Sequence, residues 1–205
     1  MARRADHTRE ELKSLILDAA WKITGAEGFE GLTARRIASE IGYAPGTIYN
    51  LFASMDDLYL QICGRTLDQL YGVLSSSECN NPKHDPLRNM KMMATLYMKF
   101  AREYRPYWLM LFSHRMPESR KTDARHQEKV DRLFEPLEGL LQSYFPPRQD
   151  RKRKMAARVL WSSVHGLCFL QETGKIEVVG GKADMAAEMS SYLIDTFVAG
   201  MKTGK

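Results

Sequence analysis

The chain has 205 residues, 44% of them hydrophobic and 27% charged, which are ordinary values for a globular protein. No apolar run approaches the ~20 residues that a membrane-spanning helix needs. The basic start, MARRADHTREELK, lacks an apolar stretch, which excludes a secretory signal, so we expect a cytoplasmic protein with no membrane contact. The net charge of +5 favours an acidic partner only weakly, because residues 1–55 hold as many acidic as basic side chains.

The first elements predicted along the chain are three helices separated by short breaks. Apolar residues recur at steps of three and four from Thr8 to about Gly25, which indicates an amphipathic helix. Thr33 is suited to cap a second, short helix, and Gly42 is suited to end it in a left-handed conformation. Pro45 fits the first position of a third helix, so the order up to residue 52 is helix, helix, turn, helix.

The rest of the chain is also predicted to be helical. A longer helix starts near Ser54 and runs to about residue 74, and SSSECNNPKHDP (75–86) is the clearest linker. Alternation of β-branched residues is nearly absent, so we predict an all-α fold with about nine helices. The remaining five helices are expected at about 86–104, 106–114, 118–145, 149–173 and 182–202.

The third helix has one apolar side and one small, polar and aromatic side. With Ile48 at the centre of the buried side, Gly46 and Asn50 point the opposite way, and Thr47 and Tyr49 flank them. A DNA major groove admits one helix, and side chains of this kind contact its base edges and phosphates. The pattern therefore predicts a DNA-binding surface.

Two arginines start the second helix, where a helix-turn-helix crosses the DNA backbone. Arg35 and Arg36 oppose the helix dipole there, and an anionic partner would explain them. Arg3, Arg4 and Arg9 are candidates for an N-terminal arm along the minor groove, and a disordered arm is the alternative.

The segment LTARRIASEIGYAPGTIYNLFASMDDL (32–58), preceded by ILDAAWKITGAEGF (16–29), resembles the helix-turn-helix of the tetracycline-repressor (TetR) family of bacterial transcription factors. More loosely, RPYWLMLF (105–112) and WSSVHGL (161–167) resemble TetR-like C-terminal domains with a Trp-then-His-Gly signature. The resemblance implies a DNA-binding domain over residues 1–53 and a ligand-binding and dimerisation domain over residues 54–205.

The resemblance also implies a function. We expect a ligand-responsive transcriptional regulator, a homodimeric repressor that a small apolar or aromatic effector releases from a palindromic operator on double-stranded DNA. The alternative is a DNA-binding structural or interaction protein without an effector. The expected phosphate contacts come from Thr33, Arg35, Arg36, Thr47 and Tyr49. The expected base-edge contacts come from Pro45, Gly46 and Asn50, with Ala44 beside them.

This chain departs from the common family pattern in the DNA-binding segment. Asn50 stands where His is common, and Ala44 stands where a capping Ser is common. Ala53 and Met55 replace frequent lysines that would touch phosphate. Weaker electrostatic attraction at the end of the third helix is the expected consequence.

The larger C-terminal part is rich in Met and aromatic residues, which suit an adaptable apolar cavity. The resemblance implies that such a cavity binds the effector, whereas ordinary core packing is the alternative for each residue, including a hydrogen-bonded core His165. The candidate pocket residues are Met93, Tyr97, Phe100, Tyr104, Trp108, Phe112, Trp161 and His165.

The last helix repeats apolar or small residues on one side. Together with the helix before it, this side can form an isologous four-helix dimer interface, as the resemblance implies, and packing within the monomer is the alternative. RKRK (151–154) is interpreted as a solvated face, with an acidic partner as the alternative. The candidate interface residues are Ala186, Met189, Leu193, Phe197 and Met201.

No motif indicates an enzyme, a cofactor or a metal. The chain has no G-x-S-x-G, P-loop or G-x-G-x-x-G sequence, and its five histidines lack metal-ligand spacing. Cys63, Cys79 and Cys168 are widely spaced and form no C-x-x-C, so reduced thiols are expected.

Overall fold

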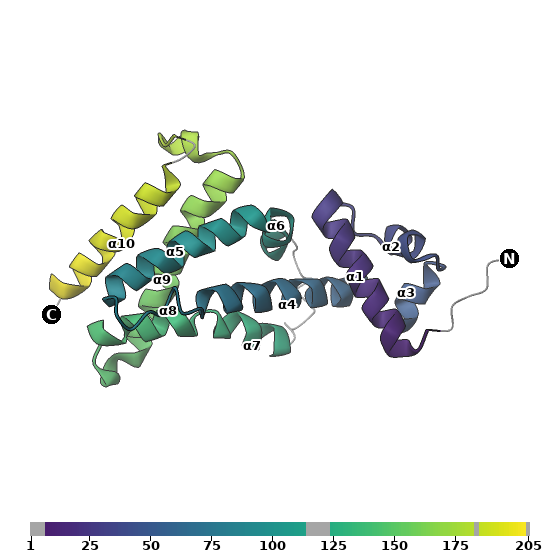
Figure 1. Cartoon of the computed structure of the whole chain (residues 1–205), viewed down its shortest axis with the longest axis horizontal. Helices are drawn as coiled ribbons and strands as arrows, with labels where there is room; N and C mark the ends of the chain where they lie inside the picture. Colours follow the sequence, from purple (N-terminus) through teal and green to yellow (C-terminus); the bar gives the residue numbers. More distant parts are fainter. Residues whose placement is uncertain (1–6, 114–123, 183–184, 204–205) are drawn as a thin grey trace. The chain divides into compact units, whose positions relative to one another are not determined.

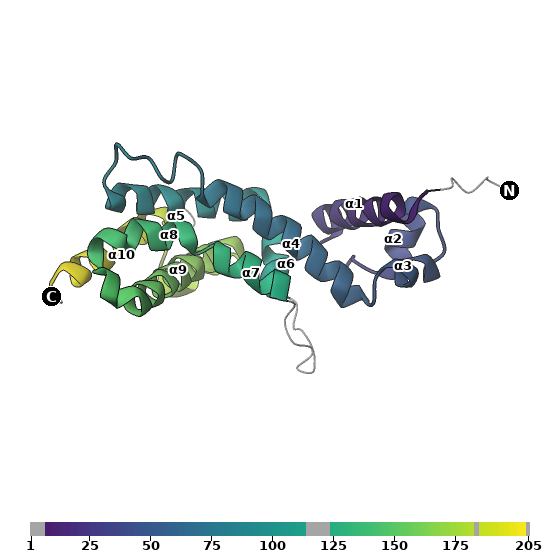
Figure 2. The same ribbon diagram turned by 90° about the horizontal axis from the view of Figure 1, so that it is seen from below.

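The computed structural model describes residues 7–113, 124–182 and 185–203 (Figure 1 and Figure 2). Within these ranges the chain forms α-helices and short 3-10 helices and no strand, so the all-α prediction is confirmed. The α-helices are α1 (Arg9–Glu27), α2 (Ala34–Ile41), α3 (Gly46–Leu51), α4 (Met55–Leu74), α5 (Pro86–Glu103), α6 (Arg105–Ser113), α7 (Ala124–Arg132), α8 (Glu135–Leu140), α9 (Asp150–Glu172) and α10 (Ala186–Thr203). The 3-10 helices are η1 (Leu141–Tyr144), η2 (Pro147–Gln149) and η3 (Ile176–Val179).

The single helix predicted at 118–145 is wrong within the described residues, because α7 and α8 are separate helices. Pro136 lies in the first turn of α8. In the middle of a continuous helix, Pro136 would remove one backbone hydrogen bond, and its ring would clash with the carbonyl of Arg132. The first six residues of the predicted helix, 118–123, lie outside the described residues.

Packing divides the chain into two compact units. The first unit comprises Met1–Thr66 and Pro106–His126, and the second comprises Leu67–Arg105 and Gln127–Lys205. The predicted functional boundary after residue 53 follows the end of the DNA-binding motif and stays a prediction.

The first three helices of the first unit are fixed by local signals in the sequence. Thr8 and Glu11 form a capping box at the start of α1. The Thr33 side chain accepts a hydrogen bond from the Arg36 amide at the start of α2, and Gly42 ends α2 with φ 73°. Both predicted boundaries of α2 are therefore confirmed. Figure 1 shows α1, α2 and α3 lying together.

The core of the first unit joins these helices to the start of α4 and to α6. Ile16, Ile37, Ile48 and Leu58 are fully buried there, and Met110 of α6 packs with them. Ile48 is the residue predicted to centre the buried side of α3. Its burial leaves the opposite side of α3 at the surface.

The second unit is built around α5, α9 and α10. Helix α5 begins at Pro86 after an Asp85 cap, where the missing proline N–H leaves no hydrogen bond unmade. Helix α10 packs against both α5 and α9. The central side chains include Met90, Leu160 and Ile194, each at most 2% exposed.

Candidate functional site

The surface of the first unit that faces away from Ile48 consists of small, polar and aromatic residues. Ala44, Pro45, Gly46 and Asn50 are exposed, and Tyr49 is 55% exposed. Thr47 is half-buried at the edge of this surface, which we call the α3 surface. The structure thus brings together the predicted base-contacting residues, whereas their contacts with DNA stay a prediction.

Gly46 is not required by the fold. A Cβ built on Gly46 meets no heavy atom within 4 Å, and its backbone does not need a left-handed conformation. A glycine in a helix weakens it by ~1 kcal/mol relative to alanine. Since nothing in the first unit benefits from the missing side chain, the open space at Gly46 is suited to close approach by a partner.

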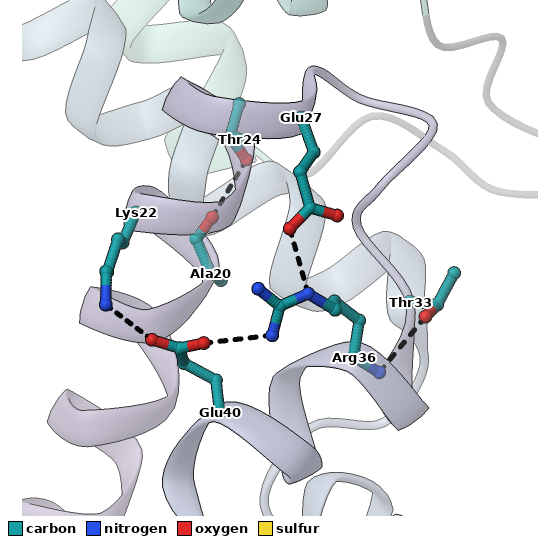
Figure 3. Close-up of polar contacts among 7 residues, drawn as sticks. All are labelled: Ala20, Lys22, Thr24, Glu27, Thr33, Arg36 and Glu40. Carbon is teal, nitrogen blue, oxygen red and sulfur yellow. Dashed lines mark hydrogen bonds and ion pairs between the residues drawn. The ribbon is translucent and has the colours of Figure 1, made fainter.

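Arg36 has a partner on each side within the protein (Figure 3). Its Nε donates to Glu27 Oε1 at 2.9 Å, and its Nη1 donates to Glu40 Oε2, also at 2.9 Å. Lys22 Nζ donates to the other oxygen of Glu40 at 2.6 Å. Arg36 therefore ties α2 to the end of α1, and two carboxylates compete with any phosphate for its guanidinium.

These contacts shift the pKa values of the charged groups. Lys22 and then Arg36 hold the pKa of Glu40 below its ordinary value of 4.5. Glu40 and then Glu27 raise the pKa of Arg36. Arg35, by contrast, lies exposed on the first turn of α2. Of the two predicted arginine contacts to phosphate, the structure leaves Arg35 more accessible.

A contact that the sequence analysis missed joins the start of the described chain to the α2–α3 turn. His7 Nδ1 and Tyr43 Oη lie 2.8 Å apart, within hydrogen-bonding distance. The two residues are 36 positions apart, and neither belongs to a periodic pattern, so no signal in the sequence pairs them. The contact fixes the chain just before α1 beside the turn that precedes α3.

The second unit contains a small apolar cavity of about 40 Å³. Met93, Tyr97 and Trp161, three of the predicted pocket residues, line this cavity together with Phe134, Leu137 and others that the sequence analysis did not select. A cavity of this size has room for about one water molecule, whereas drug-sized ligands occupy ~300–1,000 Å³. A larger ligand would require the lining side chains to move.

An aromatic cluster adjoins this cavity, and it contains a pair of polar side chains, Tyr97 and His165. Tyr97 Oη and His165 Nδ1 lie 2.7 Å apart. Trp161 stacks on His165 with ring centroids 4.9 Å apart, and Phe134 meets Trp161 edge to face. Burial lowers the pKa of His165, which favours the neutral imidazole. His165 thus lies in an apolar environment beside the cavity.

The other predicted pocket residues lie elsewhere. Phe100 and Tyr104 stack on each other in the second unit and do not line the cavity. Trp108 and Phe112 belong to the first unit, where Trp108 is fully buried and Phe112 is exposed. Three of the eight predicted residues therefore line this cavity, and the predicted effector pocket stays a prediction.

An apolar groove of about 510 Å³ lies along α9 and α10. Met189 and Leu193, from the predicted dimer interface, line it together with Leu167 and Tyr192. Tyr192 is 74% exposed, which is unusual for a large side chain in a groove lined by apolar residues.

The remaining predicted interface residues do not line this groove. Ala186 is fully buried within the chain, and Phe197 and Met201 are half-buried. On α9, Met155 and Val159 add exposed apolar area, at 57% and 47% exposure. The accessible apolar surface thus includes residues that the predicted stripe omitted.

Neither a metal site nor a reactive thiol is apparent in the part of the chain that the structure describes. No three His, Cys, Asp or Glu side chains gather there in a way that could hold a metal ion. Burial raises the pKa values of Cys63 and Cys168 to about 12, so both thiols stay protonated. No described helix is both long and apolar enough to cross a membrane.

The fold and the α3 surface define a class of protein, a helix-turn-helix protein with a second all-helical unit. Two family models match the chain: "Bacterial regulatory proteins, tetR family" over residues 16–62, and "Tetracyclin repressor-like, C-terminal domain" over residues 90–197. The chain therefore belongs to the tetR family of transcriptional regulators, which confirms the resemblance. The finer Trp-His-Gly assignment stays a prediction.

Individual proteins agree with this assignment. An uncharacterized HTH-type transcriptional regulator of Mycobacterium tuberculosis is 25% identical over 177 residues, which cover 86% of this chain and 76% of that one. A Rhodococcus sp. RHA1 protein of unknown function has the same fold, with a TM-score of 0.72, 18% identity and coverage of 97% and 98%. The multidrug binding protein EbrR, solved with imidazole, has a TM-score of 0.58, 19% identity and coverage of 94% and 96%.

Proposed function

We propose that this regulator is a homodimeric repressor in the cytoplasm that binds a palindromic operator and leaves it when a small apolar or aromatic effector binds. The observation that carries the proposal is the α3 surface, where Gly46, Tyr49 and Asn50 are exposed opposite the buried Ile48. In a helix-turn-helix protein, the second helix of the motif enters the major groove while the first crosses the backbone. Arg35 and Thr33 are exposed at the start of α2, which supports their assignment to phosphate contacts.

The groove along α9 and α10 supports the homodimer. A helix as short as α3 contacts few base pairs, and a two-fold dimer with heads about one DNA turn apart doubles that number. Tyr192, Met189 and Leu193 would bury apolar area against a second copy of the groove. Ala186 contributes to the packing of its own unit instead, because it is fully buried there.

The cavity beside Tyr97 and His165 supports the effector site. Its lining is almost wholly apolar, and the Tyr97–His165 pair supplies a polar group at its edge. Met90 and Met93 can change rotamer at low cost and so enlarge the cavity. An effector that binds the enlarged form more tightly shifts the protein toward that form, and it releases DNA if that form binds the operator weakly.

The experiment that tests the proposal is selection of bound fragments from bacterial genomic DNA with the full chain, followed by affinity measurements against salt. We expect a palindromic site. If about six phosphates are contacted, affinity falls ~10³-fold between 50 and 200 mM salt. Binding that ignores sequence would favour the alternative, a DNA-binding structural protein without an effector.

A second measurement tests the effector. Displacement of the operator complex by a panel of small apolar and aromatic compounds should identify at least one that releases DNA. Tyr97→Phe should reduce that response while leaving operator affinity unchanged, because Tyr97 lies in the second unit. A wild-type complex that no compound in such a panel releases would count against the effector.

A further inference from the structure

We infer that the α3 surface reads A·T base pairs, with Asn50 contacting adenine and with Ala44 and Pro45 contacting thymine methyl groups. The inference rests on the proposed function and specifies which operators the protein can recognise. Its basis is the chemistry of the residues that the first unit exposes around α3.

The segment that forms the turn and α3 carries no charge. Residues 41–55, IGYAPGTIYNLFASM, include no Lys, Arg, Asp or Glu. The commonest contact that specifies guanine is a bidentate Arg or Lys at O6 and N7, and Asp or Glu accepts from the N4 amino group of cytosine. The segment therefore lacks the side chains that most often specify a G·C pair.

Asn50 is the side chain in this segment whose chemistry is suited to a specific base contact. It is exposed on the last turn of α3, and it is the only amide side chain in residues 41–55. A side-chain amide can donate to adenine N7 and accept from adenine N6 at the same time. In the major groove, adenine alone presents that adjacent acceptor and donor on one base.

Ala44 and Pro45 supply apolar contacts at the start of the same surface. Both are exposed, and they directly precede Gly46, where the surface has open space. The N-terminal residues of a recognition helix commonly contact base edges. An aliphatic surface there favours the C5-methyl group of thymine over the polar edge of cytosine. The missing Cβ of Gly46 lets this part of the surface approach the bases closely.

Three nearby cations of α1 and α2 are assigned other roles, and Lys13 of α1 lies over the Phe52 ring, with its Nζ 5.6 Å from the ring centroid. Arg36 lies between Glu27 and Glu40, and Lys22 pairs with Glu40. Arg35 is exposed on the first turn of α2, the helix that crosses the DNA backbone in this motif. Arg35 is therefore assigned to phosphate. A guanine contact from Arg35 is the outcome that most directly opposes the inference.

The test is selection from a random DNA pool by the full-length protein, with Asn50→Ala, Asn50→Gln and Arg35→Ala selected in parallel. Gln142→Ala, which removes an exposed amide in the second unit, is the matched control. Melting curves establish that each variant is folded. In the selected site, single thymines are then replaced by deoxyuridine, which removes only the methyl group.

We expect one adenine position in each half-site whose preference depends on Asn50. Asn50→Ala should weaken binding to the adenine site about 5- to 100-fold and equalise the four bases at that position. Asn50→Gln should keep the adenine preference, and Gln142→Ala should change nothing. Deoxyuridine at a neighbouring thymine should weaken wild-type binding about 3- to 5-fold.

Three results would overturn the inference. The first is that the position that responds to Asn50→Ala is a G·C pair. The second is that Arg35→Ala loses a preference for guanine. The third is that deoxyuridine has no effect at any thymine of the site. Each leaves the proposed function intact, because a specific operator has been found. Failure to select any specific sequence is different, since it refutes the proposed function and the inference together.

Discussion

Replacing Gly25 by alanine tests how α6 is held in the first unit. Tyr107 of α6 stacks on Trp21 of α1 with ring centroids 3.9 Å apart and an interplanar angle of 14°. Its hydroxyl donates to the Trp21 carbonyl oxygen at 3.1 Å. A Cβ on Gly25 would lie 2.4 Å from Tyr107 Oη and 3.1 Å from Cζ, so the ring must move.

The expected magnitude follows from what Tyr107 loses. The hydrogen bond contributes ~0.5–1.5 kcal/mol and the ring pair ~0.5–1.5 kcal/mol. Alanine in place of a helical glycine returns ~1 kcal/mol. Gly25→Ala should therefore lower the free energy of unfolding by about 0–2 kcal/mol, although alanine is the better helix former.

Gly72→Ala is the matched control. Gly72 lies two residues before the end of α4, as Gly25 lies two residues before the end of α1, and a Cβ there meets nothing within 4 Å. This change should stabilise the protein by up to ~1 kcal/mol. Urea unfolding followed by far-ultraviolet circular dichroism measures both variants.

A double-mutant cycle removes the remaining ambiguity. In a Tyr107→Ala background no ring lies beside residue 25, so Gly25→Ala should stabilise the protein by ~1 kcal/mol. If Gly25→Ala stabilises the wild-type chain as much as the Tyr107→Ala chain, the close approach of Tyr107 to Gly25 contributes nothing and the reasoning is refuted.

Three further predictions concern the α3 surface, the Arg36 contacts and the groove along α9 and α10. Gly46→Ala should leave the melting temperature unchanged or higher yet weaken operator binding about 5- to 100-fold, and unchanged affinity would mean that DNA does not approach there. Because Lys22 and Arg36 lower the pKa of Glu40 in the folded state, its contribution to stability is present above pH 4.5 and is lost as pH falls below that value. Unfolding measured between about pH 3 and 6 should thus depend less on pH in Glu40→Gln than in wild type, and equal slopes would contradict this. Tyr192→Glu should shift sedimentation from dimer to monomer and weaken operator binding, whereas Val178→Glu, at an exposed apolar residue of η3, should do neither.

Features set by neighbouring residues were predictable from the sequence, because their physical causes are local. Thr33 starts α2 through a hydrogen bond to its side chain, and Gly42 ends α2 through its left-handed backbone. The hydrogen bonds at both ends involve residues at most four positions away. The burial of Ile48 followed from helical periodicity alone. Pro136 was an equally local signal for the break between α7 and α8, although the sequence analysis did not use it.

Features set by distant residues were not predictable. The Arg36–Glu40 pair has helical i, i+4 spacing and could have been found, but Glu27 lies across the break between α1 and α2. Tyr97 and His165 are 68 residues apart. The apolar periodicity of each helix indicates its buried side but does not identify the residue on the other helix that it contacts. Trp108 and Trp161 were both selected because the C-terminal part is rich in aromatic residues, but Trp108 belongs to the first unit.

The dimer prediction illustrates a limit of periodicity in a helix with apolar residues on more than one side. Ala186 of the predicted stripe packs inside the chain, Leu193 and Phe197 are half-buried, and the most exposed apolar side chain of α10, Tyr192, lies next to the stripe. Periodicity identifies apolar sides but not their partners. Only the exposure of each side chain in the folded chain distinguishes the apolar side that packs within the monomer from the side that is available to a partner.

The distribution of charge links the dimer to DNA recognition. Of the first unit's cations, Arg36 and Lys22 are paired with carboxylates, Arg9, Lys13 and Arg35 are exposed, and residues 41–55 carry none. The α3 segment itself therefore adds little phosphate attraction, which supplies most non-specific affinity for DNA, and Arg35 of α2 is left to supply it. The sequence preference of α3 must then come from short-range contacts at base edges, which are few for a six-residue helix and are doubled by a second copy. It follows that loss of the dimer should reduce operator binding more than loss of any single phosphate contact.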